Sequence, residues 1–232
     1  MLEEAGSCAG GKGAGERLIG SCIKFTKADT MKTTAPTDRH DFFAFLARMQ
    51  YINRWGLMRN TQPENIKEHS LDVAMLAHAL VVIRNTFYGG TLDPNQAAMY
   101  GIFHDASEIF TGDMPTPVKH FNPHFKKSFH QLEDRARRKL LAMLPPELSQ
   151  VYEPLFFFEE QDEQYKPVIK AADKISALIK CLEEEKSGNL EFKRAGQEHL
   201  ENLRKSPLPE VIYFLDHFLP GYRLSLDELY LG

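Results

Sequence analysis

Hydrophobic residues recur at helical spacing along most of the chain from residue 37 onward. The first such stretch predicts an amphipathic helix that is capped by Thr37 or Asp38. Its apolar positions are Phe42, Phe43, Phe45, Leu46, Met49 and Ile52. The pattern breaks at Gly56, so we expect this first helix to end near that glycine.

Two further helices have recognisable start signals. Asn65, with Glu68 three residues later, forms a capping box that opens the second helix. The apolar positions of this helix are Leu71, Met75, Leu76, Leu80 and Ile83. Asp93 followed by Pro94 is a good start for the third helix, because aspartate caps and proline suits the first turn. We expect the third helix to carry the pair His104-Asp105.

Prolines delimit the elements in the middle of the chain. The run Met114-Pro115-Thr116-Pro117 forces a loop. A long helix is expected from about Pro123 to Leu144, where Pro145-Pro146 stops it. The next strong helix runs from Tyr165 to Glu185. Its apolar stripe consists of Val168, Ile169, Ala172, Ile175, Leu178, Ile179 and Leu182.

The C-terminal part continues the helical pattern. We expect helices around residues 190–205 and 208–218, and Ser225 with Glu228 forms a capping box for a short last helix. No stretch alternates convincingly with a period of two, and no repeat of 20–50 residues is evident. The sequence therefore predicts an all-α protein, with residues 37–232 forming one helical bundle.

Residues 1–36 differ from the rest of the chain. Glycines are frequent between Gly6 and Gly20, polar residues dominate, and neither helical nor strand periodicity is found. The glycine-rich run from Gly10 to Gly15 lacks the Gly-Lys-Ser/Thr ending of a phosphate-binding loop. We expect residues 1–36 to be a disordered extension outside the fold, and Met31 is a candidate native start.

Composition and charge narrow the classes of protein. Of the 232 residues, 43% are hydrophobic and 26% are charged, as in an ordinary soluble domain. The net charge of -4 argues against a binder of nucleic acid or of anionic membranes. No apolar run approaches the ~20 residues of a membrane helix. The three cysteines lack metal-site spacing, which is typical of free thiols in the reducing cytoplasm.

Four residues form a candidate metal site. Each lies on a predicted helix whose apolar stripe would be buried, so all four can face one bundle core: His69, His104, Asp105 and Asp173. Two imidazoles and two carboxylates suit manganese, iron, cobalt, nickel or zinc. A lone core histidine is usually only hydrogen-bonded, so the prediction depends on the whole set. The histidines that follow the proline-rich loop are expected to have surface or loop roles. We therefore expect one metal ion.

Several motifs carry a resemblance to a known family. The set His69, His104-Asp105 and Asp173 matches the signature of the HD-domain metal-dependent phosphohydrolases. More specific stretches resemble the bacterial 5'-deoxynucleotidases of the YfbR type, and the resemblance runs from about Phe42 to near the C-terminus. These stretches are Ile52–Asn60, Glu68–Leu71, His104–Glu108 and Thr111–Lys119. The departures, Gly56 and Met114, replace no group with a chemical role.

The resemblance implies a homodimeric enzyme that removes phosphate from deoxyribonucleoside 5'-monophosphates. It also implies little base preference and selection against ribonucleotides. One divalent cation is expected in each subunit, with cobalt favoured in vitro and manganese or another transition metal as alternatives. We expect His69, His104, Asp105 and Asp173 to hold this cation, with His69 and Asp173 also bordering the substrate.

Further residues have expected roles beside the metal. Glu108 follows Asp105 by one helical turn and is placed to orient or deprotonate a water molecule, although helix solvation is an alternative. Arg54 can pair with two phosphate oxygens and stabilise charge that develops on them. Trp55, the only tryptophan, can pack against the sugar, and an ordinary core role is the alternative. The turn that could meet the sugar hydroxyl consists of Asp113, Met114, Pro115 and Thr116.

Two other functions remain open from the sequence. The first is an HD phosphohydrolase that acts on another nucleotide, such as a nucleoside triphosphate or a cyclic nucleotide. Arg54, Trp55 and the Asp113–Thr116 turn argue against it, and a substrate panel decides. The second is a non-catalytic helical module that binds a metal or a nucleotide. The loss of a metal ligand or of Glu108 would favour that module, yet all of these residues are present.

Overall fold

The computed structural model describes residues 39–119 and 121–231, without the side chains of Thr116, Gln161 and Leu231. The proposed extension 1–36 and the candidate caps Thr37 and Asp38 lie outside these residues, so they stay predictions. In the described ranges every regular element is a helix, and the only strand-like feature is an isolated backbone bridge between Asn53 and Asn65. The predicted all-α class is therefore confirmed.

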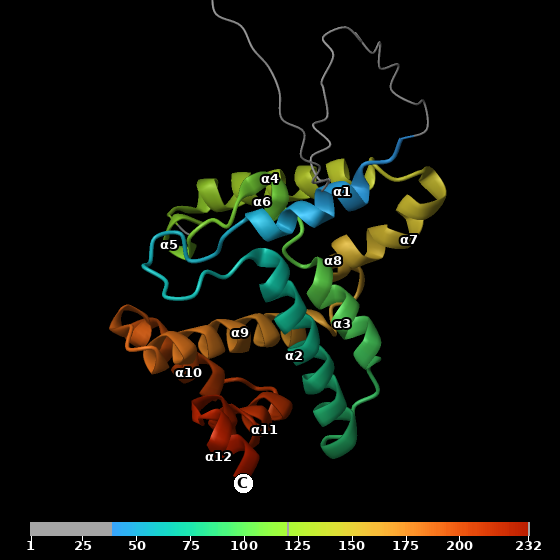
Figure 1. The fold of residues 1–232 in the computed structure, drawn as a ribbon. Coiled ribbons are helices and arrows are strands. Elements are labelled where there is room, and N and C mark those ends of the chain that lie inside the picture. Colours follow the sequence, from blue (N-terminus) through green and yellow to red (C-terminus); the bar gives the residue numbers. More distant parts are fainter. Residues whose placement is uncertain (1–38, 120, 232) are drawn as a thin grey trace, which may run out of the picture. The chain divides into compact units, whose positions relative to one another are not determined.

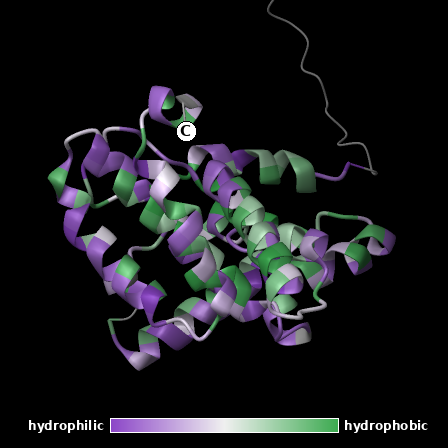
Figure 2. Cartoon of the chain, turned by 90° about the horizontal axis from the view of Figure 1, so that it is seen from below, coloured by the Kyte–Doolittle hydropathy of each residue, from purple (hydrophilic) through white to green (hydrophobic). Residues whose placement is uncertain are grey.

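Three helices form the centre of the described part of the chain. Helix α2 (Ile66–Phe87) packs along α3 (Pro94–Phe103), and α9 (Lys166–Lys186) crosses α2 (Figure 1). The predicted start signals of α2 and α3 are both present. Asn65 and Glu68 form a capping box at the start of α2, and the Asp93 side chain caps the start of α3. Hydrophobic residues, green in Figure 2, concentrate on helices in the middle of the packed region.

The remaining elements surround this centre as two groups. The first group packs a second core around the fully buried Phe42. The helices of this group that contribute to this core are α1 (Phe42–Leu46), α4 (Glu108–Thr111), α6 (Pro123–Leu141) and α7 (Pro146–Phe156). The elements η1 (Ala47–Tyr51), α5 (Thr116–Lys119) and α8 (Phe158–Gln161) adjoin these helices along the chain, and Phe158 packs in the central core. The second group follows α9. It comprises η2 (Leu190–Phe192), α10 (Lys193–Arg204), α11 (Pro209–His217), η3 (Leu219–Arg223) and α12 (Leu226–Leu231).

Several predicted boundaries are wrong. Helix α3 ends at Phe103, so His104 and Asp105 lie in the turn after it rather than inside it. Backbone bonds of the tighter i to i+3 type continue from there to Glu108, where α4 begins. Helix α6 ends at Leu141 instead of Leu144. Helices α7 and α8 are not among the predicted elements, although prolines at the start of α7 suit its first turn.

The apolar stripe predicted for α2 is only partly correct. Leu76, Leu80 and Ile83 are buried, whereas Leu71 and Met75 are each 56% exposed. By length and composition α2 could cross a membrane, contrary to the expectation that no run approaches this length. It is instead a core helix, because it packs against α3, α9 and α11 and carries the fully buried His69.

The backbones of α2 and α3 approach each other closely at Gly101. A Cβ atom added at Gly101 would lie 2.7 Å from the Cα atom of Ala74, which is backbone that a side-chain rotation cannot move away. Ala74 lies a little over one turn after His69, and Gly101 lies three residues before His104. The missing side chain at position 101 therefore sets the spacing of the two helices that position these histidines.

We expect Gly101→Ala to lower the free energy of unfolding by about 1–3 kcal/mol, because the added methyl group overpacks the contact between α2 and α3. Urea denaturation measures this change. Gly221→Ala is the matched control, since a Cβ there would only touch a Leu229 methyl group at 3.8 Å. Equal stabilities for Gly101→Ala and the wild-type protein would show that the two helices have room to separate.

Candidate metal centre and substrate pocket

His69 is a fully buried histidine near the start of α2. The side chain of Asn65 accepts hydrogen bonds from the backbone nitrogens of Lys67 and Glu68 and so fixes the first turn. The Nδ1 atom of His69 lies 3.1 Å from the hydroxyl oxygen of Ser176 on α9. With Nδ1 donating to this hydroxyl, the lone pair of Nε2 is free to bind a cation.

His104 has a similar arrangement on the other side. Its Nδ1 atom lies 2.7 Å from the carbonyl oxygen of Gly101. Because a carbonyl oxygen only accepts, this contact requires the proton on Nδ1 and leaves a lone pair on Nε2. The turn that follows α3 brings Asp105 to the same place, with its Oδ2 atom 3.1 Å from His104 Nε2 and 3.5 Å from His69 Nε2.

These side chains converge in a way that fits a metal ion. One ligand atom from each of His69, His104 and Asp105 lies within 4.8 Å of the others. Asp173 on α9 does not belong to that group of three, but its Oδ1 atom is 3.2 Å from His69 Nε2. The Nε2 atoms of both histidines are buried without a hydrogen-bond partner. Buried lone pairs beside carboxylates fit a divalent cation, and Asp173 is placed to join them.

The electrostatics of the cluster favour a positive charge there. Burial by itself would raise the pKa of Asp105, but the adjacent His104, with His69 and Arg54, lowers it. Burial opposes protonation of His104, yet Asp105 and Asp173 raise its pKa to about 9. The pKa values of Asp105 and Asp173 are both lowered, so these carboxylates keep their negative charge and would stabilise a cation that replaces the imidazole proton.

Glu108 lies beside this cluster at the start of α4 and is only 3% exposed. Its Oε1 atom accepts a hydrogen bond of 3.1 Å from Lys119 Nζ, whereas Oε2 has no partner. Burial raises the pKa of Glu108 to about 9, and the charge of Asp105 adds to this effect. A buried carboxyl group with a raised pKa can hold or transfer a proton near neutral pH.

Arg54 and Trp55 project from the loop between η1 and α2. The guanidinium of Arg54 donates to Glu64 Oε2 at 2.8 Å and lies 3.9 Å from Asp173 Oδ1. Trp55 has φ +60°, a left-handed conformation that costs a non-glycine residue about 1–3 kcal/mol. Its backbone nitrogen donates to Asp113 Oδ2 at 3.2 Å, which helps to hold this conformation.

A cavity of about 680 Å³ adjoins the cluster, a size typical of small-molecule sites. Arg54, Trp55 and Asp173 line it together with the predicted turn residues Asp113, Met114 and Pro115. Thr116 begins α5, but its side chain lies outside the described part of the structure. Apart from Glu108, which lies beside the cluster, the structure brings every predicted site residue whose side chain it describes to this cavity or to the adjoining cluster.

A second cavity of about 350 Å³ reaches the cluster from another side. His104, Asp105 and Asp173 line it together with Lys119, Lys126 and Lys170. Asp173 borders both cavities, so the candidate metal centre lies between the pocket with Arg54 and Trp55 and one rich in lysine. Carboxylates line both cavities as well, so cationic groups such as Arg54 and Lys119 would contact an anionic ligand individually.

The sequence analysis missed the residues that support the site. Ser176 orients His69, and Glu64 binds both Arg54 and Trp55. Buried Glu184 accepts hydrogen bonds from the backbone of Thr61 and Gln62, and so fastens the loop that carries Arg54 to α9. For Ser176 and Glu184, the only indication in the sequence is that they share one face of α9 with Asp173.

Solved structures share this fold. An HD-domain phosphohydrolase from Listeria innocua superposes with a TM-score of 0.69 at 22% identity, over 78% of this chain and 88% of the other. An HD phosphohydrolase of cyanophage S-2L, bound to dA and one catalytic Zn²⁺ ion, gives a TM-score of 0.52 at 21% identity, over 77% and 96% of the chains. The described helices thus adopt the fold of the HD-domain phosphohydrolases.

The sequence comparisons give the family. The profile described as 5'-deoxynucleotidase YfbR-like matches residues 41–222. A 5'-deoxynucleotidase of Shewanella oneidensis is 49% identical over 187 residues, which is 81% of this chain and 96% of the relative. A 5'-deoxynucleotidase of Vibrio cholerae is 47% identical over 188 residues, or 81% and 97%. The chain belongs to the YfbR-like 5'-deoxynucleotidase family, as its motifs indicated.

Proposed function

We propose that this protein is a metal-dependent 5'-deoxynucleotidase, which hydrolyses deoxyribonucleoside 5'-monophosphates to deoxynucleosides and phosphate. The main support is the convergence of His69, His104 and Asp105 beside a cavity that Arg54 and Trp55 line. Relatives at 49% and 47% identity that are named 5'-deoxynucleotidases support the reaction. The residues that would hold one divalent cation are His69, His104, Asp105 and Asp173.

A divalent cation held by these residues would polarise a phosphate oxygen and lower the pKa of a water molecule bound to it. The chain's own residues position the substrate around this centre. Arg54 offers a planar, charged donor group that matches phosphate oxygens. Glu108 is buried within hydrogen-bond reach of Lys119, and it would hold the proton that passes from the attacking water to the leaving 5'-oxygen.

Selection for the deoxyribose would come from the pocket around Trp55. The side chain of Asp113 is fixed by the backbone nitrogen of Trp55, and Met114 and Pro115 line the same cavity. A rigid wall that leaves no space for a 2'-hydroxyl would reject a ribonucleotide through steric conflict. Contacts that end at the sugar would leave the base free, which accounts for little base preference.

The first test compares deoxyadenosine and adenosine 5'-monophosphate with cobalt and again with EDTA, and phosphate release is measured. We expect release from the deoxy compound in the presence of cobalt and none with EDTA, because chelation removes the cation. Equal release from both nucleotides would reject the sugar selection. No release from either nucleotide, with cobalt bound, would redirect the proposal to nucleoside triphosphates or cyclic nucleotides.

We expect Glu108→Gln to lower kcat by roughly 10²- to 10⁴-fold, the usual contribution of a proton-transferring group. The amide keeps an oxygen for Lys119, so bound cobalt and nucleotide affinity should change little. His69→Ala is the matched comparison and should lose bound cobalt and activity together. Elemental analysis and steady-state kinetics measure both effects. A loss of cobalt from Glu108→Gln would make its role structural.

We also propose that two copies of the chain form a dimer in the cytoplasm, as the family resemblance implies. Exposed Leu71 and Met75 on α2 support a contact surface of this kind, since large apolar side chains on one helix face favour burial. Light scattering should give twice the mass of one chain, and Met75→Glu should shift it toward one. An unchanged mass in this variant would place the contact elsewhere.

A further inference from the structure

Glu64 joins the two residues of the loop that face the substrate cavity. One carboxylate oxygen, Oε2, accepts a hydrogen bond of 2.8 Å from Arg54 Nη1 and another of 2.7 Å from Trp55 Nε1. The other oxygen, Oε1, lies 3.8 Å from His69 Nδ1. The side chain of Glu64 is only 11% exposed. A single, largely buried carboxylate thus binds the arginine and the tryptophan and lies near His69, a candidate metal ligand.

Backbone hydrogen bonds hold the segment around Glu64 in place. Arg54 N donates to Glu64 O at 2.9 Å, and Ile66 N donates to Ile52 O at 2.9 Å. These bonds join the two ends of the loop at the isolated bridge between Asn53 and Asn65. The backbone of Glu64 is therefore fixed immediately before the N-cap of α2, so its side chain can hold its hydrogen-bond partners in place.

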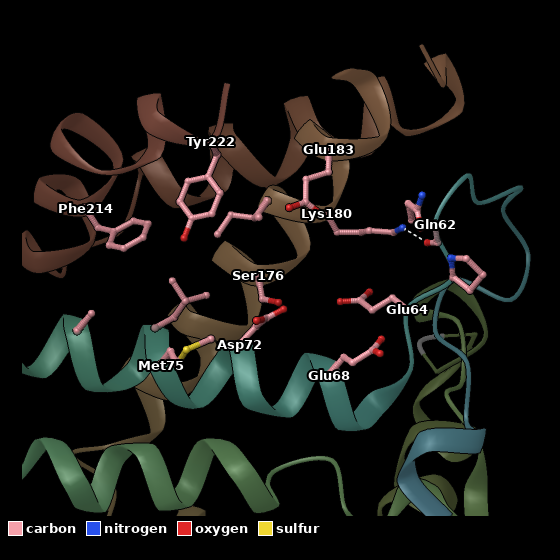
Figure 3. Close-up of a pocket in the computed structure, with 14 residues that line it drawn as sticks. Gln62, Glu64, Glu68, Asp72, Met75, Ser176, Lys180, Glu183, Phe214 and Tyr222 are labelled. Carbon is pink, nitrogen blue, oxygen red and sulfur yellow. Dashed lines mark hydrogen bonds between the residues drawn. The ribbon is translucent and has the colours of Figure 1, made fainter. Parts of the chain in front are cut away.

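Glu64 also separates two cavities. Figure 3 shows its carboxylate between α2 and α9, in the wall of a cavity that Glu68, Asp72 and Ser176 line as well. Arg54 and Trp55 line the substrate cavity, which does not include Glu64. The carboxylate therefore reaches these two side chains from behind, on the side away from the proposed substrate.

We infer that Glu64 is a positioning residue for the proposed nucleotidase reaction, and this inference rests on the proposed function. It fixes the guanidinium of Arg54 toward the phosphate site and the indole of Trp55 toward the sugar site. A long arginine side chain that is ordered before the substrate arrives loses less freedom on binding. The shared acceptor oxygen also couples the two side chains, so that neither can turn away without losing a buried hydrogen bond.

The test combines kinetics with the fluorescence of Trp55, the only tryptophan in the chain. We expect Glu64→Ala to lower kcat/KM for deoxyadenosine 5'-monophosphate by roughly 10- to 100-fold, since small misplacements of a binding group have effects of this size. The emission maximum of Trp55 should shift to longer wavelength, because the released indole turns out of the partly buried site into water. Bound cobalt should stay at the wild-type amount.

Two conservative variants separate the effect of side-chain length at position 64 from the effect of its charge. Glu64→Gln keeps an oxygen for both donors but loses the charge, so it should retain the wild-type emission and part of the activity. Glu64→Asp keeps the charge but is one methylene shorter, so its emission should shift as in the alanine variant. Glu68→Gln is the matched control in the same cavity wall. Glutamine also completes a capping box there, and neither readout should change.

A double-mutant cycle identifies the residue through which Glu64 acts. If Glu64 works through Arg54, adding Glu64→Ala to Arg54→Ala should lower kcat/KM by less than about threefold. Losses that add both to those of Arg54→Ala and to those of Trp55→Ala, unchanged emission in Glu64→Ala, or loss of cobalt would each overturn the inference. If Glu64→Ala does not fold, the pair Glu64→Gln and Glu64→Asp decides. A wild-type protein without activity would refute the proposed function, while the emission spectra would still test the contact.

Discussion

The close approach of α2 and α3 at Gly101 is the constraint on which the candidate metal centre depends. The two backbones meet where Gly101 faces Ala74, with no room for a side chain at position 101. This contact places His69 and His104 opposite each other, with ring centroids 5.2 Å apart. The carbonyl of the same glycine then orients His104. One residue thus sets both the distance between the two imidazoles and the protonation of one of them.

Helix α9 completes the arrangement from one face. Asp173 approaches the metal centre, Ser176 orients His69, and Lys180 and Glu184 bind the loop that carries Arg54 and Trp55. These residues are three or four positions apart, so a straight helix presents them in one line. Burial would raise the pKa of Glu184, but hydrogen bonds from Lys180, Thr61 and Asn189 lower it. The loop is thereby fastened to the helix that supplies Asp173.

The cationic side chains of the site are held in place by ion pairs with carboxylates. Arg54 lies between Glu64 and Asp173, and Lys119 lies against Glu108. Lys119 is held by one carboxylate, whereas Arg54 has carboxylates on two sides, at 2.8 Å from Glu64 and 3.9 Å from Asp173. Such prior ordering matters for phosphoryl transfer, in which positioning and electrostatic stabilisation provide most of the catalysis. Asp173 borders cavities on both sides, one lined by Arg54 and Trp55 and the other by Lys119, Lys126 and Lys170 together with carboxylates.

The sequence alone indicated the helical class, the capping boxes of α2 and α12, and the candidate set His69, His104, Asp105 and Asp173, because these depend on local spacing and on motifs. It could not show that α3 ends before His104, since the turn that follows is held by i to i+3 backbone bonds, and the residue pattern does not separate these from the bonds of an α-helix. Nor could it assign Leu71 and Met75 to an exposed face, because periodicity does not say which neighbours cover a helix. Only the tertiary structure revealed Glu64 and Ser176, whose partners Arg54, Trp55 and His69 come from other elements. Hydrogen bonds between elements follow from packing, and a one-dimensional pattern does not contain them.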